Sequence, residues 1–99
     1  VETAAAVWKC IEDRTLVINA LVNITAECDC MPGENRTIAK DVGFIAGYHP
    51  VTMDAESLTL IGAKVFENAH PDVPWQHQFE YAKKIGFCTD ALRIPARKA

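Results

Sequence analysis

Residues 15–25, "TLVINALVNIT", constrain the fold more than any other stretch of this chain. Every even-numbered position from 16 to 24 is apolar, whereas the odd positions mix apolar residues with Asn19 and Asn23. Because the side chains of a strand point alternately to its two faces, this pattern predicts a strand with one wholly apolar face and one mixed face. Such a strand is typical of a sheet that other elements cover, so we expect it in the interior of the fold.

The rest of the chain supplies helices to cover this strand. Ala4, Trp8 and Ile11 share one face of an alanine-rich helix, and Thr52 is placed to cap the longest helical stretch. The predicted elements in chain order are a helix over 2–13, strands over 15–25 and 42–48, a helix over 52–68, a helix from Pro74 to Gly86 and a short strand over 91–95. The order α-β-β-α-α-β predicts an α/β or α+β fold with a small helix-covered sheet.

Length and charge narrow the classes of protein further. With 99 residues and a hydrophobic fraction of 49%, we expect residues 1–99 to form a single domain, with the basic residues 93–99 as a frayed tail. The net charge of -3, with no basic run, argues against nucleic acid, and no apolar stretch is long enough to span a membrane. Since the chain begins at Val1, we interpret it as a fragment or the C-terminal part of a longer protein.

The stretch 26–37, "AECDCMPGENRT", holds the most informative polar residues, Cys28 and Cys30. They can be a metal clamp, part of a disulfide framework or reduced thiols in a tight loop. Four cysteines and two glycosylation patterns, at Asn23 and Asn35, suit a secreted protein. However, a core of long apolar elements needs no disulfides, so we expect a cytoplasmic protein. The other two cysteines, Cys10 and Cys88, are expected to be buried as small apolar residues.

Cys28 and Cys30 on extended backbone point to the same side and can together chelate zinc or iron. A further ligand depends on how the strands over 15–25 and 42–48 pair. Parallel strands bring the cysteine loop near His49 and Asp54, because the carboxyl ends of such strands meet. Antiparallel strands bring Asp41 near the cysteines instead.

Three further polar residues have simpler interpretations. Asp54 suits the positive N-terminal end of the helix over 52–68, and it also faces inward, where a catalytic base would lie. His70 and His77 are interpreted as surface residues of a loop and a helix.

Three motifs in the chain occur in the same order in one known family. They are "T-A-E-C-D-C" at Thr25–Cys30, "D-V-G-F-I-A" at Asp41–Ala46 and "P-V-T-M-D-A" at Pro50–Ala55. In this order they resemble the C-terminal part of domain-of-unknown-function family 362, the uncharacterised Fe-S centre proteins. The resemblance covers roughly residues 16 to 90. The chain departs from the family pattern at Gly47, where the family has Ser, and at His49, where it has Asp.

The resemblance implies an iron-sulfur cluster in the full-length protein, held by a ferredoxin-like partner module. This chain has four cysteines and no C-x-x-C, so it cannot hold a typical four-iron cluster by itself. The leading hypothesis is a domain of an iron-sulfur or metal-associated protein, with Cys28 and Cys30 as the metal or thiol site. One alternative is an enzyme that uses Asp41, Asp54 and a cysteine thiolate. The other is a non-catalytic structural or self-association domain, in which the chain forms a homo-oligomer.

Overall fold

The structure is a computed structural model that describes residues 1–27 and 36–87. Its elements are α1 (Glu2–Ile11), the 3-10 turn η1 (Glu12–Arg14), β1 (Val17–Leu21), β2 (Gly43–Gly47), α2 (Pro50–Ile61), α3 (Ala63–Ala69) and α4 (Gln76–Lys84). The predicted small α/β fold is confirmed, with helices covering one face of the sheet. The expectation that β1 lies in the interior of a covered sheet is wrong for the described residues, because β1 pairs there with β2 alone and its even-numbered residues are exposed. The predicted strand over 91–95 and the tail over 93–99 lie outside the described residues. Among the described helices, none is both long and apolar enough to cross a membrane.

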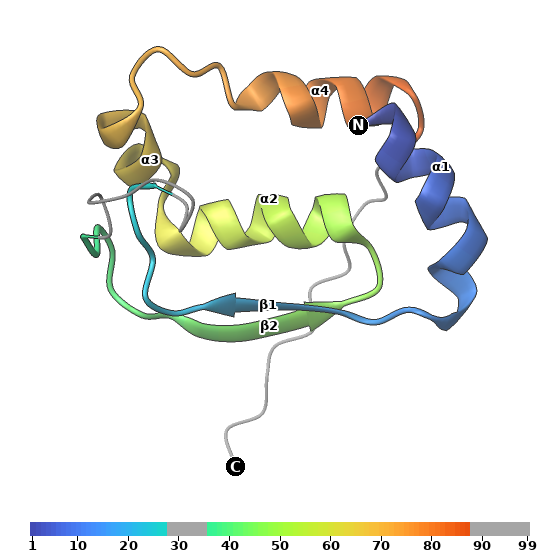
Figure 1. The fold of residues 1–99 in the computed structure, drawn as a ribbon, viewed down its shortest axis with the longest axis horizontal. Coiled ribbons are helices and arrows are strands. Elements are labelled where there is room, and N and C mark those ends of the chain that lie inside the picture. Colours follow the sequence, from blue (N-terminus) through green and yellow to red (C-terminus); the bar gives the residue numbers. More distant parts are fainter. Residues whose placement is uncertain (28–35, 88–99) are drawn as a thin grey trace.

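β1 and β2 form a two-stranded antiparallel sheet in which Val17 lies opposite Gly47 and Leu21 opposite Gly43. Figure 1 shows α2 lying along one side of the two strands, with α4 beyond it and α1 at one end. The layers are therefore sheet, then α2, then α4. The antiparallel pairing settles the question that the sequence left open, and its consequences for the polar residues are described below.

The face of the sheet that α2 covers is the mixed one. Val17, Asn19 and Leu21 of β1 are buried or half-buried, whereas Ile18 and Ala20 between them are exposed. Hydrophobicity alone favours packing of the wholly apolar face. The mixed face is covered because Asn19 forms hydrogen bonds to α2 and because glycine on β2 lets that helix come close. Within the described residues, the wholly apolar face of the sheet has no cover.

Gly47 determines how closely α2 approaches the sheet. A Cβ atom at this position would lie 2.3 Å from Sδ of Met53, a buried residue one turn into α2. Glycine in a strand permits such a close approach of another element, because it has no side chain to displace.

The helix predicted over 52–68 is two helices, and it starts earlier than expected. Gly62 has φ 95°, which α-helical backbone does not adopt, so α2 ends there and α3 begins after it. α2 starts at Pro50, whose fixed φ suits a first turn, and not after a Thr52 cap. The first turn of α2 therefore contains no acidic residue, and Asp54 lies beyond it.

The main buried cluster joins α1 to the C-terminal end of α4. Trp8, Ala82 and Phe87 pack together, and the partly buried residues Ala5, Val17 and Val51 pack against them. Gly86, which the sequence predicts to end the last helix, has φ 75° and donates its N–H to the carbonyl of Lys83 (3.1 Å). Phe87 donates to the carbonyl of Ala82 (2.8 Å), completing a Schellman motif that turns the Phe87 ring into this cluster.

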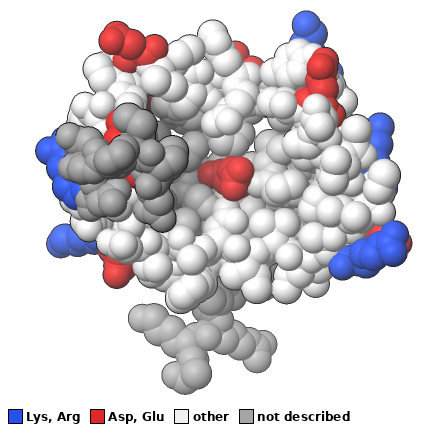
Figure 2. All heavy atoms as spheres, viewed as in Figure 1, with Lys and Arg blue, Asp and Glu red and all other residues white. Residues whose placement is uncertain are grey.

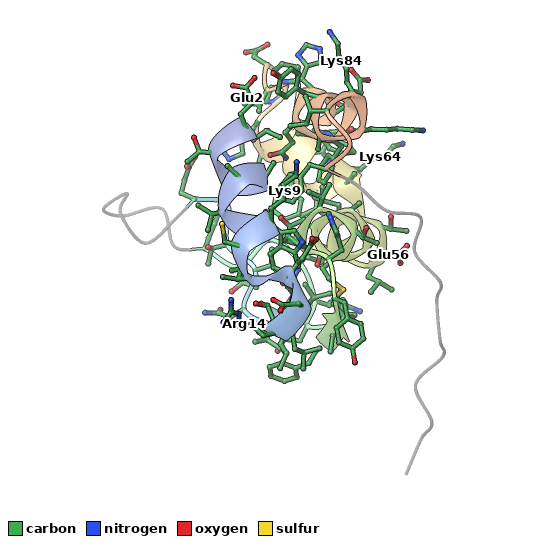
Figure 3. All side chains as sticks on the ribbon, turned by 90° about the vertical axis from the view of Figure 1, so that its right-hand side faces the viewer. Glu2, Lys9, Arg14, Glu56, Lys64 and Lys84 are labelled. Atoms are coloured by element: carbon green, nitrogen blue, oxygen red, sulfur yellow. The ribbon has the colours of Figure 1, made fainter. Side chains whose placement is uncertain are left out.

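Two expectations for α1 are corrected. Cys10, expected to be buried, is exposed with a free thiol, because the face of α1 that packs inward is the one that carries Trp8. Ile11, expected on the packed face, is also exposed, at 36%. Figure 3 shows the Glu2 end of α1 next to α4 and the Arg14 end near the strands. The Tyr81 hydroxyl of α4 donates a hydrogen bond to the Glu2 carboxylate.

The contact between Gly47 and Met53 predicts that Gly47→Ala lowers the free energy of unfolding by about 1–3 kcal/mol, since the added methyl displaces a buried side chain. Denaturant unfolding followed by circular dichroism measures this change. Ala6→Gln is the control, because Ala6 is exposed on α1, away from the sheet, and its change should stay within about 0.5 kcal/mol. Equal destabilisation by both variants would contradict the close approach of α2.

Candidate functional site

The described residues on either side of 28–35 are tied together by backbone pairing. Ile38 donates its N–H to the carbonyl of Ile24 (2.9 Å), and Ala26 donates to Arg36 (3.3 Å) around an isolated bridge between Thr25 and Thr37. Cys28 follows Glu27 directly in the sequence, and both Cys28 and Cys30 lie outside the described residues. We call the paired segments 23–27 and 36–41 the loop base.

Asp41 belongs to the loop base. Its Oδ1 accepts a hydrogen bond from the backbone N–H of Asn23 (2.7 Å), a residue with φ 52° that lies two positions after the end of β1. The bond compensates for that left-handed backbone, which asparagine tolerates better than most residues. Of the two further ligands expected from the sequence, Asp41 is therefore the one that lies at the loop base, as antiparallel strands require.

His70, expected from the sequence at the surface and not as a ligand, also contacts the loop base. It caps the C-terminal end of α3, is half-buried, and its Nε2 lies 2.8 Å from the carbonyl oxygen of Ala26. The same nitrogen lies 3.5 Å from Oε1 of Glu27. Because 44 residues separate His70 from Ala26, no local spacing in the sequence signals this contact.

His49 lies at the opposite end of the sheet. It lies two residues after Gly47, which pairs with Val17, the first residue of β1. The loop base, by contrast, follows Leu21, the last residue of β1. Its ring packs between Trp8 (centroids 5.8 Å apart) and Phe87 (5.2 Å). Nδ1 is buried without a hydrogen-bond partner among the described residues, and burial lowers the pKa of the imidazole, against the opposing effect of the Glu12 carboxylate.

Asp54, expected to face inward, is an exposed residue, and it has a different set of partners. The side-chain amide of Asn19 donates to Oδ1 of Asp54 (3.1 Å) and to the hydroxyl of Ser57 (2.9 Å), and that hydroxyl donates to the carbonyl of Met53 (2.7 Å). An asparagine amide has two hydrogens, so both donations are possible at once. These bonds account for the polar residue in the middle of an otherwise apolar strand. Asp41 and Asp54 bind different parts of the chain.

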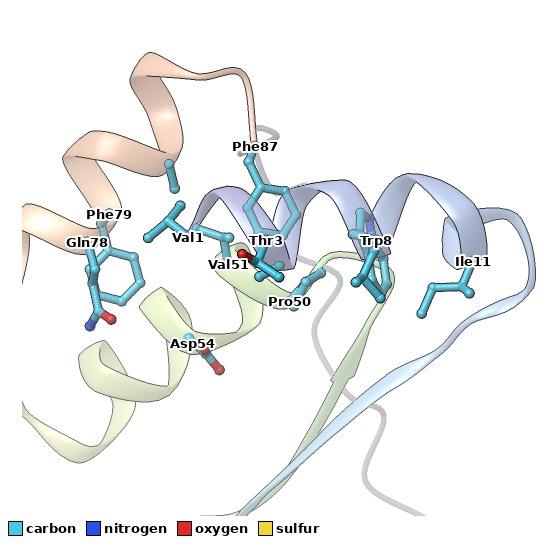
Figure 4. Close-up of a pocket in the computed structure, with 13 residues that line it drawn as sticks. Val1, Thr3, Trp8, Ile11, Pro50, Val51, Asp54, Gln78, Phe79 and Phe87 are labelled. Atoms are coloured by element: carbon cyan, nitrogen blue, oxygen red, sulfur yellow. The ribbon is translucent and has the colours of Figure 1, made fainter.

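Asp54 also borders an open hollow between α1, α2 and α4, with a volume of about 640 Å³. Figure 4 shows Trp8 and Ile11 reaching it from α1, Gln78 and Phe79 from α4, and Asp54 as the one labelled carboxylate. In Figure 2 most charged side chains lie around the rim of this face, and one acidic group lies near its centre, over α2. The hollow is therefore an apolar depression with one carboxylate that Asn19 holds in place.

The loop base meets only part of the requirement for a metal site. No three metal-ligating side chains gather among residues 1–27 and 36–87. Asp41 has one carboxylate oxygen in a hydrogen bond, and a carboxylate has a second oxygen that can coordinate a metal. With its proton on Nε2, facing Ala26, the His70 ring carries a lone pair on Nδ1. Asp41 and His70, at or against the loop base, thus each have a donor atom left for a metal.

No family model, curated protein or solved structure matches this chain.

The surroundings of His49 predict that the chain loses stability in mild acid. With its pKa below 6.5 in the folded chain, His49 stays neutral while the unfolded chain takes up a proton as the pH falls through about 6.5. Stability therefore falls below that pH until the folded pKa is passed. His49→Phe should remove this component, and unfolding midpoints in denaturant at about pH 7.5 and about pH 5 measure it.

His77→Gln is the matched control, because His77 is an exposed histidine on α4. It should keep the acid sensitivity of the parent chain. An identical loss of stability in the parent and in His49→Phe would show that His49 titrates as an ordinary exposed histidine.

Proposed function

We propose that this chain is a domain of an iron-sulfur or metal-associated protein, in which Cys28 and Cys30 bind a metal over the loop base. The observation that carries the proposal is the antiparallel register of β1 and β2. It ties together the two ends of the segment that contains the cysteines and sets Asp41 at that end of the sheet. Two thiolates with one oxygen or nitrogen ligand make a site suited to zinc or iron.

The contact between His70 and Ala26 supports the proposal chemically. A histidine that binds a metal through one ring nitrogen almost always donates its other N–H to a backbone carbonyl or a carboxylate. The Nε2 atom of His70 faces both, at Ala26 and at Glu27. His70 is therefore the added ligand that we propose, beside Asp41. His49, at the far end of the sheet between two aromatic rings, is left out of the site.

The metal would hold the two thiolates together and, if it is iron, could pass electrons to a cluster in a ferredoxin-like partner module. In this proposal the chain's own residues provide the binding surface. The hydrogen bond between Asp41 and Asn23 and the bridge between Thr25 and Thr37 hold the two segments of the loop base together. The family resemblance adds to this proposal through its "T-A-E-C-D-C" and "D-V-G-F-I-A" motifs, which border the same loop.

An enzyme that uses Asp41, Asp54 and a thiolate remains the alternative proposal. Asp54 lies beside the apolar hollow and is oriented by Asn19, which suits a positioned carboxylate. Asp41 binds the backbone of Asn23 at the loop base. A single site with both carboxylates would need to bridge these two places, so the metal proposal has the simpler geometry.

Metal analysis of the anaerobically purified chain tests the proposal. Zinc or iron should be present in the parent and nearly absent after Cys28→Ser together with Cys30→Ser. His70→Gln should lower the affinity for added Zn²⁺ or Fe²⁺ by about tenfold to a hundredfold, as for loss of a ligand or of its orientation.

Cys10→Ser and His77→Gln are the controls, since both residues are exposed on helices away from the loop base. Both should keep the metal content of the parent. Metal contents that are equal in the parent and the double cysteine variant would remove Cys28 and Cys30 as ligands and end the proposal.

A further inference from the structure

The face of the sheet turned away from α2 is apolar from end to end. Ile18, Ala20, Phe44 and Ala46 point to it from the two strands, and alternation adds the flanking residues 16, 22, 42 and 48. The large side chains of this outer face, with their exposed fractions, are Leu16 (53%), Ile18 (61%), Val22 (38%), Val42 (46%), Phe44 (72%) and Tyr48 (79%). Figure 1 shows α2, α3 and α4 all on the other side of the strands.

The outer face carries more large apolar side chains than the described core. Only five hydrophobic residues are buried among the described ones, namely Trp8, Leu21, Met53, Ala82 and Phe87. A contiguous apolar surface of this kind on a folded chain marks an interaction site. We infer that the outer face is where a second copy of this chain docks, sheet against sheet. This inference is independent of the proposed metal site.

The area of the outer face fits a dimer of moderate strength. At about 150–250 Å² for a whole aromatic side chain, Phe44 and Tyr48 together expose about 300 Å². The four aliphatic side chains, each about half exposed, add an exposed apolar area about half as large as that of the two aromatic side chains. The sum approaches the lower end of specific interfaces, about 600 Å² per partner, once a polar rim is included. We therefore expect a dimer that dissociates on dilution.

The chemistry of the face favours a second copy over a charged partner. Its positions carry no ionisable group except the Tyr48 phenol, which lies at the end of the face where it can stay in water. Two copies related by a two-fold axis thus meet apolar surface with apolar surface and bury no unpaired charge. Arg14 and Asp13 precede β1, and Lys40 and Asp41 precede β2, so each end of the face has both signs of charge beside it. In a dimer, each end of the outer face can therefore lie against either end of the outer face of the other copy without placing only like charges together.

Face-to-face packing also distinguishes this dimer from pairing along the strand edges. Two sheets that stack in this way lie about 10 Å apart and interdigitate their side chains, which would bury Phe44. Edge pairing would extend the sheet through backbone hydrogen bonds and leave Phe44 in water. A charge at Phe44 therefore separates the two modes.

Sedimentation equilibrium of the 99-residue chain, from low micromolar to near-millimolar concentration, tests the inference. The parent should pass from monomer to dimer, and Phe44→Glu should raise the dissociation constant about tenfold or more. Ile18→Lys, on the other strand of the same face, should act in the same direction. Val73→Glu is the control, because Val73 is also an exposed apolar residue (55%, against 61% for Ile18) but lies between α3 and α4, and it should leave the dimer unchanged.

Circular dichroism of each variant shows whether it keeps the parent fold. A dimer that survives Phe44→Glu and Ile18→Lys would place the contact elsewhere, such as the strand edges, and overturn the inference. A parent that stays monomeric at every concentration would overturn it as well. In that case, loss of stability in folded Phe44→Glu would indicate that residues 88–99 of the same chain cover the face.

Discussion

In the sheet of this protein, Val17 lies opposite Gly47 and Leu21 opposite Gly43. This register fixes which polar residues can meet. It sets Asp41 beside the backbone of Asn23 at the end of β1 from which the cysteine loop leaves. It also carries His49 to the other end, where the ring packs between Trp8 and Phe87. The candidate site and the aromatic cluster are thus opposite ends of one two-stranded ribbon.

Asn19 and Gly47 explain why the helices cover the less apolar face of the two-stranded sheet. Asn19 is a polar residue in the strand, but its amide satisfies Asp54 and Ser57 on α2, so its burial leaves no unpaired donor. Gly47 lacks a side chain, and Met53 fills the space. Specific hydrogen bonds and shape therefore orient the sheet, and the more apolar face has no cover among the described residues.

The separation of the two histidines has a physical basis as well. His49 is held by aromatic rings, and burial lowers its pKa, which favours a neutral ring with a structural role. His70 sits at the end of α3 and faces the Ala26 carbonyl and the Glu27 carboxylate, groups that orient a ring without enclosing it. Of these two rings, the one at the loop base has the surroundings of a ligand.

Much of this protein was determined by its sequence alone. The alternation over 15–25, the alanine-rich start and Gly86 at the helix end predicted the elements, because strand and helix periods and backbone preferences are local properties. The shared orientation of two cysteines on extended backbone is local too, and it stays a prediction. The break at Gly62 was missed because an isolated glycine inside a helical pattern does not by itself end a helix. The exposure of Cys10 was missed because propensity does not tell which face of a helix finds a partner. Only the tertiary structure decided the antiparallel register, the contact of His70 with Ala26 and the choice of the mixed face for packing. Each of these joins residues far apart in the chain, where shape and hydrogen bonding, and not local pattern, select the neighbour.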